Sequence, residues 1–565
     1  MLICGLKLTH DAAVSLLEDN KLIFCVEMEK INNNPRHSHF EDINNLKEIL
    51  NDFGYKISDV DCFVIDGWKN TYDACDKTGK NFLSIQEQLI EVAPYSRVAI
   101  VSNKVHFEYE NEPFHSANDV LLDNGESFPY ISYSHLYTHL AVAYCTSPFA
   151  KRGESCFISV FDGGCKPTLF YFDAQTKKFI FCEEYLNFGG HIYDSTAALF
   201  KPYGDGKTII PGRELIKKDI AGKVMAFIAT GHSSEEYKKI FYEIYDKTRN
   251  LENNQRNSFA GNAEFCREVL NSFDDACNSA DVLSSFHDFL KELIVENLLC
   301  ATQRSGYKCS NLCLSGGCAL NIKWNSAIRN TGVFKEIYIP PFTNDSGSAI
   351  GAACAEMMRI QHQYYIDWNV YCGNKIGDES VDDGWESSKC CVDKLARLIF
   401  DSQEPVVVLS GRSEGGPRAL GCRSILCDAR SLKARDDLNG IKRREWYRPV
   451  APICLEEDST LYFSPGGSDK YMLFEHQATE FAHSNVPAVI HLDGSSRLQT
   501  IAKEDNEIVY SILKSYKEIS GISVLCNTSA NNLGKGFFPD VKSAQLWGRC
   551  KYIWSEGILY TKISV

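Results

Sequence analysis

The chain has 565 residues, too many for one hydrophobic core, so two or more domains are expected. Its net charge of −15 argues against a general nucleic-acid or anionic-membrane binder, although it leaves room for a local basic groove. No apolar run reaches the roughly 20 residues that a membrane helix needs. The first residues, MLICGLKLTH, do not have the pattern of a secretory signal. The 23 cysteines form no CxxC pair. We therefore expect a cytoplasmic protein with buried, reduced thiols.

The first thirty residues contain three short β-rich runs separated by polar turns, and the same layout returns from Cys156 onward. The duplicated actin-like ATPase fold typically contains this layout twice: a strand, a glycine or polar loop, and two further strands. In that fold the first turn of each half faces the phosphates. Two hairpins can also recur by chance in any α/β protein. The expected strands lie within residues 1–8, 12–18, 21–30, 156–165, 167–174 and 178–188.

Between the two repeats, residues 134–147 have apolar side chains at helical spacing. His135 and His139 stand four apart on this predicted helix, so both imidazoles leave one face and can share a metal ion. HxxxH alone is more often two ordinary helix histidines. Asp162 in FDGG and Asp345 in NDSGSA lie in glycine turns that could complete the set. Two histidines and two aspartates suit Fe²⁺, Mn²⁺ or Zn²⁺.

An amphipathic helix is predicted over 281–303, followed by a strand and glycine loop within 311–321. Residues 337–358 read as a strand, a turn and a helix of small residues. Such a strand–loop–helix unit presents backbone donors and a helix N-terminus to an anion. The chain then becomes polar and loses periodicity, which places the domain boundary between 1–370 and 371–565.

The second part contains several cationic and glycine-rich segments in GRSEGGPRALGCRSIL, IKRREWYRPVAP, HLDGSSRLQT and CNTSANNLG. Glycine lets backbone N–H groups approach an anion, and guanidinium groups bind phosphate at two points. One such patch is usually a solvated face, whereas several together favour a phosphate site. The candidate residues are Arg418, Arg423, Lys442, Arg444, Arg448, Arg497, Asn527, Ser529 and Asn531.

GPRALGCRSIL, REWYRPVAP, AVIHLDGSSRLQT and CNTSANNLG resemble the carboxy-terminal half of the O-carbamoyltransferases that act on antibiotics, nodulation factors and cephems. The resemblance implies a YrdC-like α/β domain that binds carbamoyl phosphate and ATP with Mg²⁺ and makes carbamoyladenylate at the residues just given. The segment EMEKINNNPRHS departs from the arginine-rich EEERF segment of many members.

The first part resembles the other module of that family, an actin-like domain similar to the threonylcarbamoyl-transferase TsaD. The resemblance implies an iron ion held by His135, His139, Asp162 and Asp345. It also implies that His10, in GLKLTHDAAV, is a general base, since neutral imidazole can take a proton from an attacking alcohol. The implied adenylate-contacting residues are Gly163, Gly164, Gly316, Gly317 and Asn321.

The sequence therefore predicts an ATP-dependent O-carbamoyltransferase. Its carbamoyladenylate would pass to the first domain, and the acceptor would be a hydroxyl of a small molecule, a sugar or a hydroxymethylated nucleobase or nucleotide. Two alternatives stay open: a tRNA threonylcarbamoyl-transferring enzyme, which so acidic a chain disfavours, and a nucleotide-switched regulator without activity. The resemblance is also compatible with a homodimer.

Overall fold

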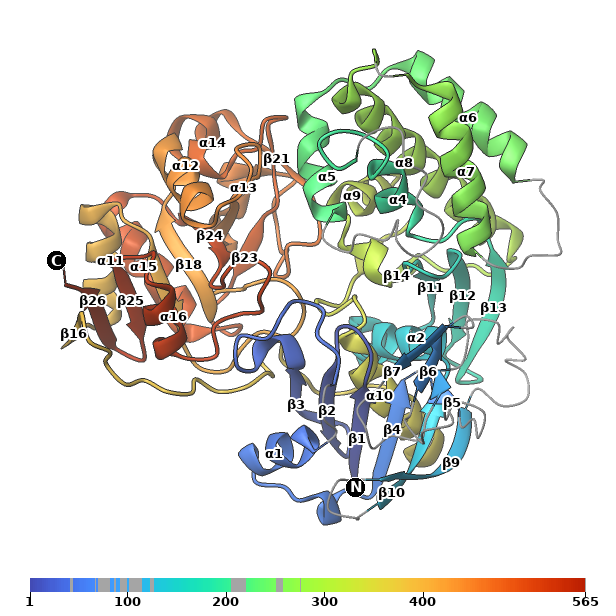
Figure 1. Cartoon of the computed structure of the whole chain (residues 1–565), viewed down its shortest axis with the longest axis horizontal. Coiled ribbons are helices and arrows are strands. Elements are labelled where there is room, and N and C mark those ends of the chain that lie inside the picture. Colours follow the sequence, from blue (N-terminus) through green and yellow to red (C-terminus); the bar gives the residue numbers. More distant parts are fainter. Residues whose placement is uncertain are drawn as a thin grey trace.

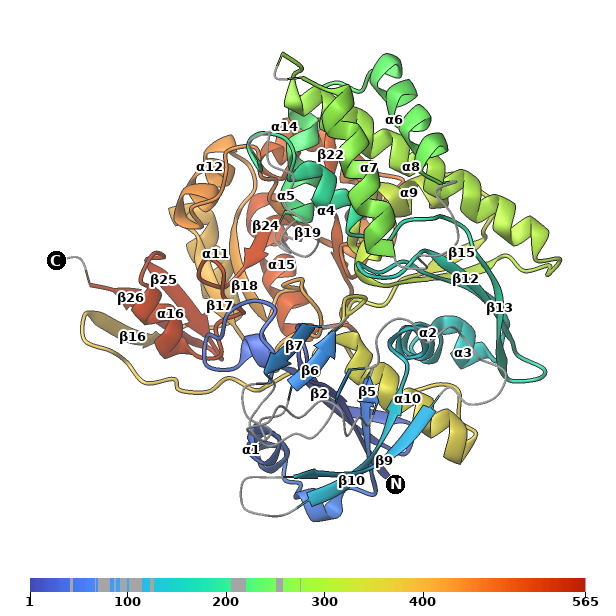
Figure 2. The same cartoon turned by 45° about the vertical axis from the view of Figure 1, so that its right-hand side comes forward.

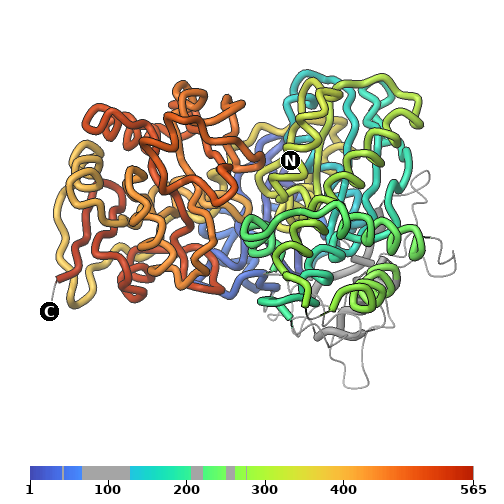
Figure 3. Tube along the Cα trace, turned by 90° about the horizontal axis from the view of Figure 1, so that it is seen from above, coloured from blue at the N-terminus to red at the C-terminus, as the bar shows by residue number. Residues whose placement is uncertain are grey.

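The computed structural model describes residues 1–40, 44–66, 68–69, 82–85, 88–91, 99–100, 114–121, 127–204, 220–249, 258–274 and 276–563. In Figure 1 two sheet-containing layers and a group of helices lie on the right, and a separate α/β body lies on the left. Figure 3 shows the first strands, in blue, between that orange body and the green part of the chain. Among the described helices, none is both long enough and apolar enough to cross a membrane.

The first two sheets repeat one topology, which confirms the duplicated actin-like fold. In each, three consecutive strands pair antiparallel, and two later strands add in parallel beside the first. The first sheet has the order β3 (Lys21–Glu27), β2 (Ala13–Glu18), β1 (Leu2–Lys7), β4 (Cys62–Asp66), β10 (Ser127–Tyr133) and β9 (Phe114–Leu121). The second has the order β13 (Lys178–Glu184), β12 (Thr168–Asp173), β11 (Cys156–Val160), β14 (Asn311–Ser315) and β15 (Glu336–Tyr338).

Two helices fill the space between these sheets, as Figure 2 shows. α10 (Gly347–Gln361) packs against β1, β2 and β4, α2 (His135–Cys145) packs against β11 and β14, and the two helices contact each other. Gly351 makes the close approach possible, because a Cβ there would lie 2.0 Å from the carbonyl oxygen of Thr138. The sheets therefore meet across α2, the helix of the HxxxH motif.

A helical cluster covers the second sheet and is stabilised by stacked and tilted aromatic rings, among them Phe241, Phe265, Phe286 and Phe289. The predicted helix over 281–303 is confirmed as α8. The cluster consists of α4 (Ile192–Ala197), α5 (Ala221–Phe227), α6 (Glu235–Thr248), α7 (Ser258–Ser272), α8 (Ser279–Arg304) and α9 (Ile322–Asn330). Shorter elements of the first part are α1 (Asn45–Asp52), α3 (Pro148–Arg152), β5 (Trp68–Lys69), β6 (Phe82–Ile85), β7 (Gln88–Glu91) and β8 (Ala99–Ile100).

The remaining body is built on an eight-stranded mixed sheet with its own apolar core. Its α/β character agrees with the prediction, and its YrdC-like relationship stays a prediction. The strand order is β16 (Trp385–Lys389), β26 (Ile558–Lys562), β25 (Tyr552–Ser555), β17 (Val406–Leu409), β18 (Arg423–Asp428), β24 (Val524–Ser529), β19 (Ala451–Leu455) and β23 (Gln499–Ile501). The helices include α11 (Val392–Ser402), α12 (Leu432–Ile441), α13 (Ser459–Tyr462), α14 (Glu480–Asn485), α15 (Glu507–Ser520) and α16 (Val541–Trp547), and a small sheet contains β20 (Phe463–Ser464), β21 (His476–Ala478) and β22 (Ser495–Ser496).

A buried ion pair joins this body to the first sheet. Lys30 Nζ lies 2.8 Å from Glu27 Oε1 and donates to the carbonyl oxygens of Glu414 and Gly416, at 2.6 and 2.7 Å. The Gly416 amide in turn donates to Glu27 Oε1, at 2.6 Å. Both charged side chains are buried, so each needs the other and the glycine loop to satisfy its charge. The glycine-rich loop is therefore fixed to the end of β3.

We expect Lys30→Met to leave the Glu27 carboxylate buried without its counter-charge. Removing one partner of a buried pair costs about 3–5 kcal/mol, so the free energy of unfolding in urea should fall by that order. Lys239→Met is the matched control, because the Lys239 side chain is 78% exposed. Equal unfolding midpoints for the two variants would show that the pair does not hold the bodies together.

Candidate active site

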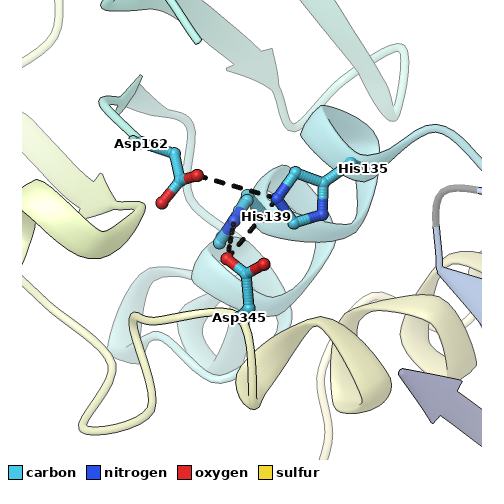
Figure 4. A group of neighbouring side chains, drawn as sticks. All are labelled: His135, His139, Asp162 and Asp345. Atoms are coloured by element: carbon cyan, nitrogen blue, oxygen red, sulfur yellow. Dashed lines mark ion pairs between the residues drawn. The ribbon is translucent and has the colours of Figure 1, made fainter. Parts of the chain in front are cut away.

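Four predicted residues converge where the two repeats meet, as Figure 4 shows. His135 and His139 come from α2, Asp162 follows β11, and Asp345 precedes α10. Each offers one ligand atom, and these atoms all lie within 4.8 Å of one another. The topology thus brings Asp162 and Asp345 to the HxxxH pair, although Asp345 is 210 positions from His135 in the sequence.

Neighbouring groups turn these side chains toward a common centre. His135 Nδ1 lies 3.0 Å from Asp66 Oδ2, which leaves Nε2 facing Asp345 Oδ1 at 3.5 Å and Asp162 Oδ2 at 3.8 Å. The amide of Gly317 donates to Asp162 Oδ1 at 2.7 Å and leaves Oδ2 for the centre. A carboxylate behind a histidine is the usual support of a metal-binding imidazole.

The charge of this cluster calls for a cation. Asp66, Asp162 and Asp345 are carboxylates, whereas Lys7 is the cation between two of them, 2.9 Å from Asp66 and 3.0 Å from Asp345. Burial opposes ionisation of Asp345, yet Lys7 and His135 hold its pKa well below its usual value. Without a metal ion, Asp66 and Asp345 hold the pKa of His135 well above its usual value although burial opposes this, so a protonated His135 supplies part of the positive charge. Metal binding requires neutral imidazoles, and the three carboxylates then exceed the ammonium by two charges, which a divalent ion would balance.

One potential ligand atom of the cluster makes no hydrogen bond to a described residue. His139 Nε2 is buried and makes no hydrogen bond with any described residue, since Asp345 Oδ1 is 3.6 Å away. An unsatisfied buried nitrogen is costly, and a metal ion at the centre would satisfy it. Two imidazole nitrogens and two carboxylate oxygens therefore fit Fe²⁺, Mn²⁺ or Zn²⁺.

His10 lies at the mouth of the cluster, on the turn between β1 and β2. Its Nε2 is 3.0 Å from Asp345 Oδ2, and 42% of the side chain is exposed. The following residue, Asp11, has a positive φ of 54°. The candidate base thus has access to solvent and touches one proposed metal ligand.

The predicted adenylate-contacting residues surround Asp162. Gly316 has a φ of +90°, and a Cβ there would lie 2.4 Å from the carbonyl oxygen of Phe161, so only glycine fits. Gly163 lies against the ring of His191, and Gly164 follows it in the same turn.

Asn321 is the N-cap residue of α9, a role that its sequence motif did not indicate. Its side-chain oxygen accepts from the Lys323 amide and caps α9. Contact of these residues with an adenylate stays a prediction.

A second candidate site is a pocket between the carboxy-terminal body and helices α5 and α9 of the first part. Six predicted residues line it: Arg418, Arg444, Arg448, Arg497, Asn527 and Ser529. Sequence reasoning missed a seventh, Arg36, which reaches the pocket from the amino-terminal part. Glu475 also lines the pocket, but it is paired with Lys323. We call this the arginine pocket.

The arginines of the pocket repel one another. Burial and the neighbouring Arg448 lower the pKa of Arg444 to about 9 and that of Arg497 to about 10. Burial and Arg497 hold the pKa of Arg418 well below its usual value. Arginine keeps its proton in proteins, so these shifts express the cost of burying positive charge, to which the crowding of the arginines adds. The Nε atoms of Arg418 and Arg497 are buried without a partner among the described residues, which an oxyanion would provide.

Three residues predicted for this site do not line the pocket. The Arg423 guanidinium is buried and donates to the carbonyl oxygens of Ser410, Cys422, Asn374 and Gly411. Lys442 donates to the carbonyl oxygens of Ser529 and Asn531, and Asn531 in turn donates to that of Lys535. These side chains tie loops together, because buried cations are satisfied here by backbone carbonyls.

The two sites share one loop. Gly317 bonds Asp162 in the first site, whereas Ile322 and Lys323, at the start of α9, line the arginine pocket. Residues 317–323 therefore reach from one site to the other.

Comparison with known proteins identifies two matching family models. One, described as Carbamoyltransferase N-terminus, matches residues 2–354, and one described as Carbamoyltransferase C-terminus matches residues 396–548. Nodulation protein U of Sinorhizobium fredii is 41% identical over 577 residues, which cover 100% of each chain. The 3'-hydroxymethylcephem-O-carbamoyltransferase of Streptomyces clavuligerus is 29% identical over 95% of this chain and 94% of its own. Among solved structures, the activator of the 2-hydroxyisocaproyl-CoA dehydratase from Clostridium difficile covers 64% of this chain and 96% of its own, at 12% identity and a TM-score of 0.33, too low to carry an argument.

We expect His139→Ala to abolish most metal binding, since it removes a buried ligand. Asp66→Asn should weaken the affinity about 10–100-fold, as is usual when the support of a metal-bound histidine is lost. Metal content by plasma mass spectrometry and thermal stabilisation by added Fe²⁺ or Zn²⁺ measure both effects. His483→Ala, on the surface, is the control, and equal metal content in all three variants would contradict the assignment.

Proposed function

The chain belongs to the carbamoyltransferase family and transfers a carbamoyl group to a hydroxyl group, and we propose that it does so in two ATP-dependent steps at the two sites. The observation that carries this proposal is the arginine pocket, in which five buried or half-buried arginines converge. Carbamoyl phosphate and ATP are the anions that a carbamoyltransferase would bring there.

In the first step, water cleaves carbamoyl phosphate to carbamate and inorganic phosphate. A carbamate oxygen then attacks the α-phosphorus of Mg²⁺-bound ATP, and the bond to the β-phosphoryl oxygen breaks. Carbamoyladenylate and pyrophosphate result. The arginines would offset the negative charge that grows on the phosphoryl oxygens, the usual main contribution of a protein to phosphoryl transfer.

The second step takes place beside His10. Because a carboxylate only accepts hydrogen bonds, His10 Nε2 donates to Asp345 and Nδ1 is left as the basic atom. His10 removes the proton of the acceptor hydroxyl, whose oxygen attacks the carbamoyl carbon, and the bond from that carbon to the adenylate oxygen breaks with release of AMP. A divalent ion held by His135, His139, Asp162 and Asp345 would supply Lewis-acid polarisation.

The intermediate needs a protected route between the sites, since an acyl adenylate hydrolyses in bulk water. The loop of residues 317–323 borders both sites and supports this route. For the acceptor, the cephem relative, whose name gives a hydroxymethyl group as its acceptor, favours the hydroxyl of a small molecule over tRNA.

Release of pyrophosphate from ATP, dependent on carbamoyl phosphate and requiring no acceptor, tests the proposal. We expect Arg418→Ala to slow it about tenfold or more, because losing a charge-assisted contact costs about 1.5–3 kcal/mol. Arg435→Ala, at a residue outside the pocket lining, is the control. An Arg418→Ala rate equal to that of the control would remove the arginine pocket from the reaction, and a wild type without such release would refute the two-step scheme.

His10→Ala should have the opposite effect. Pyrophosphate release should stay near the wild-type rate, whereas transfer from supplied carbamoyladenylate to an acceptor alcohol should fall about 10²–10⁴-fold, the usual contribution of a general base. Quenched-flow analysis of both half-reactions gives the two rates. If both rates fell in parallel, His10 would not act specifically in the transfer step.

A further inference from the structure

One short stretch of the chain contacts both sites. Residues 27–40, which we call the connecting segment, leave β3 and run along the carboxy-terminal body before returning to the first sheet. Arg36 lines the arginine pocket, and the next residue, His37, is hydrogen-bonded to the turn that carries His10. Neighbouring residues thus face two different sites.

The carboxy-terminal body fixes one end of this segment. Lys30 and Glu27 hold the loop at Gly416. The amide of Arg36 donates to the carbonyl oxygen of Gly534 at 3.0 Å, and Pro35 forms a β-bridge with Lys535. These backbone contacts place the Arg36 side chain in the pocket.

Gly536 shows how tight the contact between the segment and this body is. A Cβ at this position would lie 1.7 Å from the carbonyl oxygen of Glu29. The two backbones are therefore in direct contact, with no room for a side chain between them.

The His10 turn is held by the other end of the segment. His37 Nδ1 lies 2.7 Å from Asp11 Oδ1, and the His37 amide donates to Glu29 Oε2 at 3.0 Å. Asp11 has a φ of 54°, a conformation that a side-chain hydrogen bond helps to maintain.

Backbone hydrogen bonds close both sides of that turn. The Ala12 amide donates to the carbonyl oxygen of Ser38 at 2.9 Å, and the Phe40 amide donates to that of Leu8 at 3.1 Å. The turn that contains His10 therefore lies between two hydrogen bonds to the connecting segment.

We propose that His37 is a positioning residue for His10, and that the connecting segment makes the placement of His10 depend on the anion in the arginine pocket. This inference rests on the two-step function. With the pocket empty, Arg36 is repelled by the other arginines, and a bound polyphosphate replaces that repulsion with attraction. Arg36 and His37 are neighbours in the chain, with Cα atoms about 3.8 Å apart, so a shift of the Arg36 backbone also moves His37. His37 passes the shift to the His10 turn through its hydrogen bond to Asp11.

The segment offers a matched set of variants. His37→Ala removes the bond to Asp11, His37→Asn keeps a side-chain N–H near the same place, and His39→Ala changes an exposed histidine of the same segment. We expect His37→Ala to lower kcat of transfer from supplied carbamoyladenylate about tenfold or more, since small misplacements of a reacting group are costly. His37→Asn should recover most of that loss, and pyrophosphate release should change less than about twofold.

The second readout is the chemical reactivity of His10 toward diethylpyrocarbonate, followed by peptide mass spectrometry. In the wild type, carbamoyl phosphate with a non-hydrolysable ATP analogue should change the rate of His10 modification. The change should persist in His39→Ala and disappear in His37→Ala and Arg36→Ala. Thermal unfolding of each variant shows that it is folded.

Two outcomes would overturn the inference. Transfer by His37→Ala at the rate of His39→Ala would show that His37 does not position His10. A His10 response that survives in His37→Ala would show that the segment does not couple the sites. If the wild type releases no pyrophosphate with carbamoyl phosphate, the two-step function itself fails, and this inference fails with it.

Discussion

The burial of several positively charged arginines beside one another is the constraint on which this structure depends. The protein as a whole is acidic, with a net charge of −15, yet it gathers these guanidinium groups in one pocket. Four belong to the carboxy-terminal body, and Arg36 is supplied by the amino-terminal part. The buried Glu27–Lys30 pair and the backbone contacts of the connecting segment hold Arg36 there against the repulsion. An anionic substrate would remove the strain, so binding energy and the alignment of the two bodies are linked.

The other site has the opposite charge. Three carboxylates outnumber the Lys7 ammonium, and His139 Nε2 makes no hydrogen bond to a described residue. The charges of the two sites thus suit an anion at the arginine pocket and a cation at the other site. A carbamoyladenylate has groups for both, a phosphoryl group and a carbonyl oxygen. In the proposed two-step reaction, separating the charges in this way would let one chain form the mixed anhydride in one place and consume it in another.

The sequence predicted most of the elements, since strand and helix periodicities are local. It also identified the four residues of the proposed metal cluster, because HxxxH spacing and glycine turns are visible in one dimension. It did not assign Arg36, because the EMEKINNNPRHS segment departs from the family's arginine-rich pattern and reaches the pocket through contacts some 500 residues away in the sequence. The sequence also could not show that Arg423 and Lys442, which lie within motifs, donate hydrogen bonds to backbone carbonyl oxygens instead of lining the pocket. The direction of a side chain depends on tertiary packing.

Oxygen transfer from carbamoyl phosphate to AMP tests the two-step account most directly. If a carbamate oxygen attacks the α-phosphorus, and the acceptor later attacks the carbamoyl carbon, that oxygen remains with AMP. The two oxygens of carbamate are equivalent, so carbamoyl phosphate labelled with heavy oxygen at its carbonyl position should give AMP of which about half carries the label, as mass spectrometry of the nucleotide detects. Unlabelled AMP alongside a carbamoylated product would contradict the account, because it would show that the carbamoyl group never became attached to the adenylate.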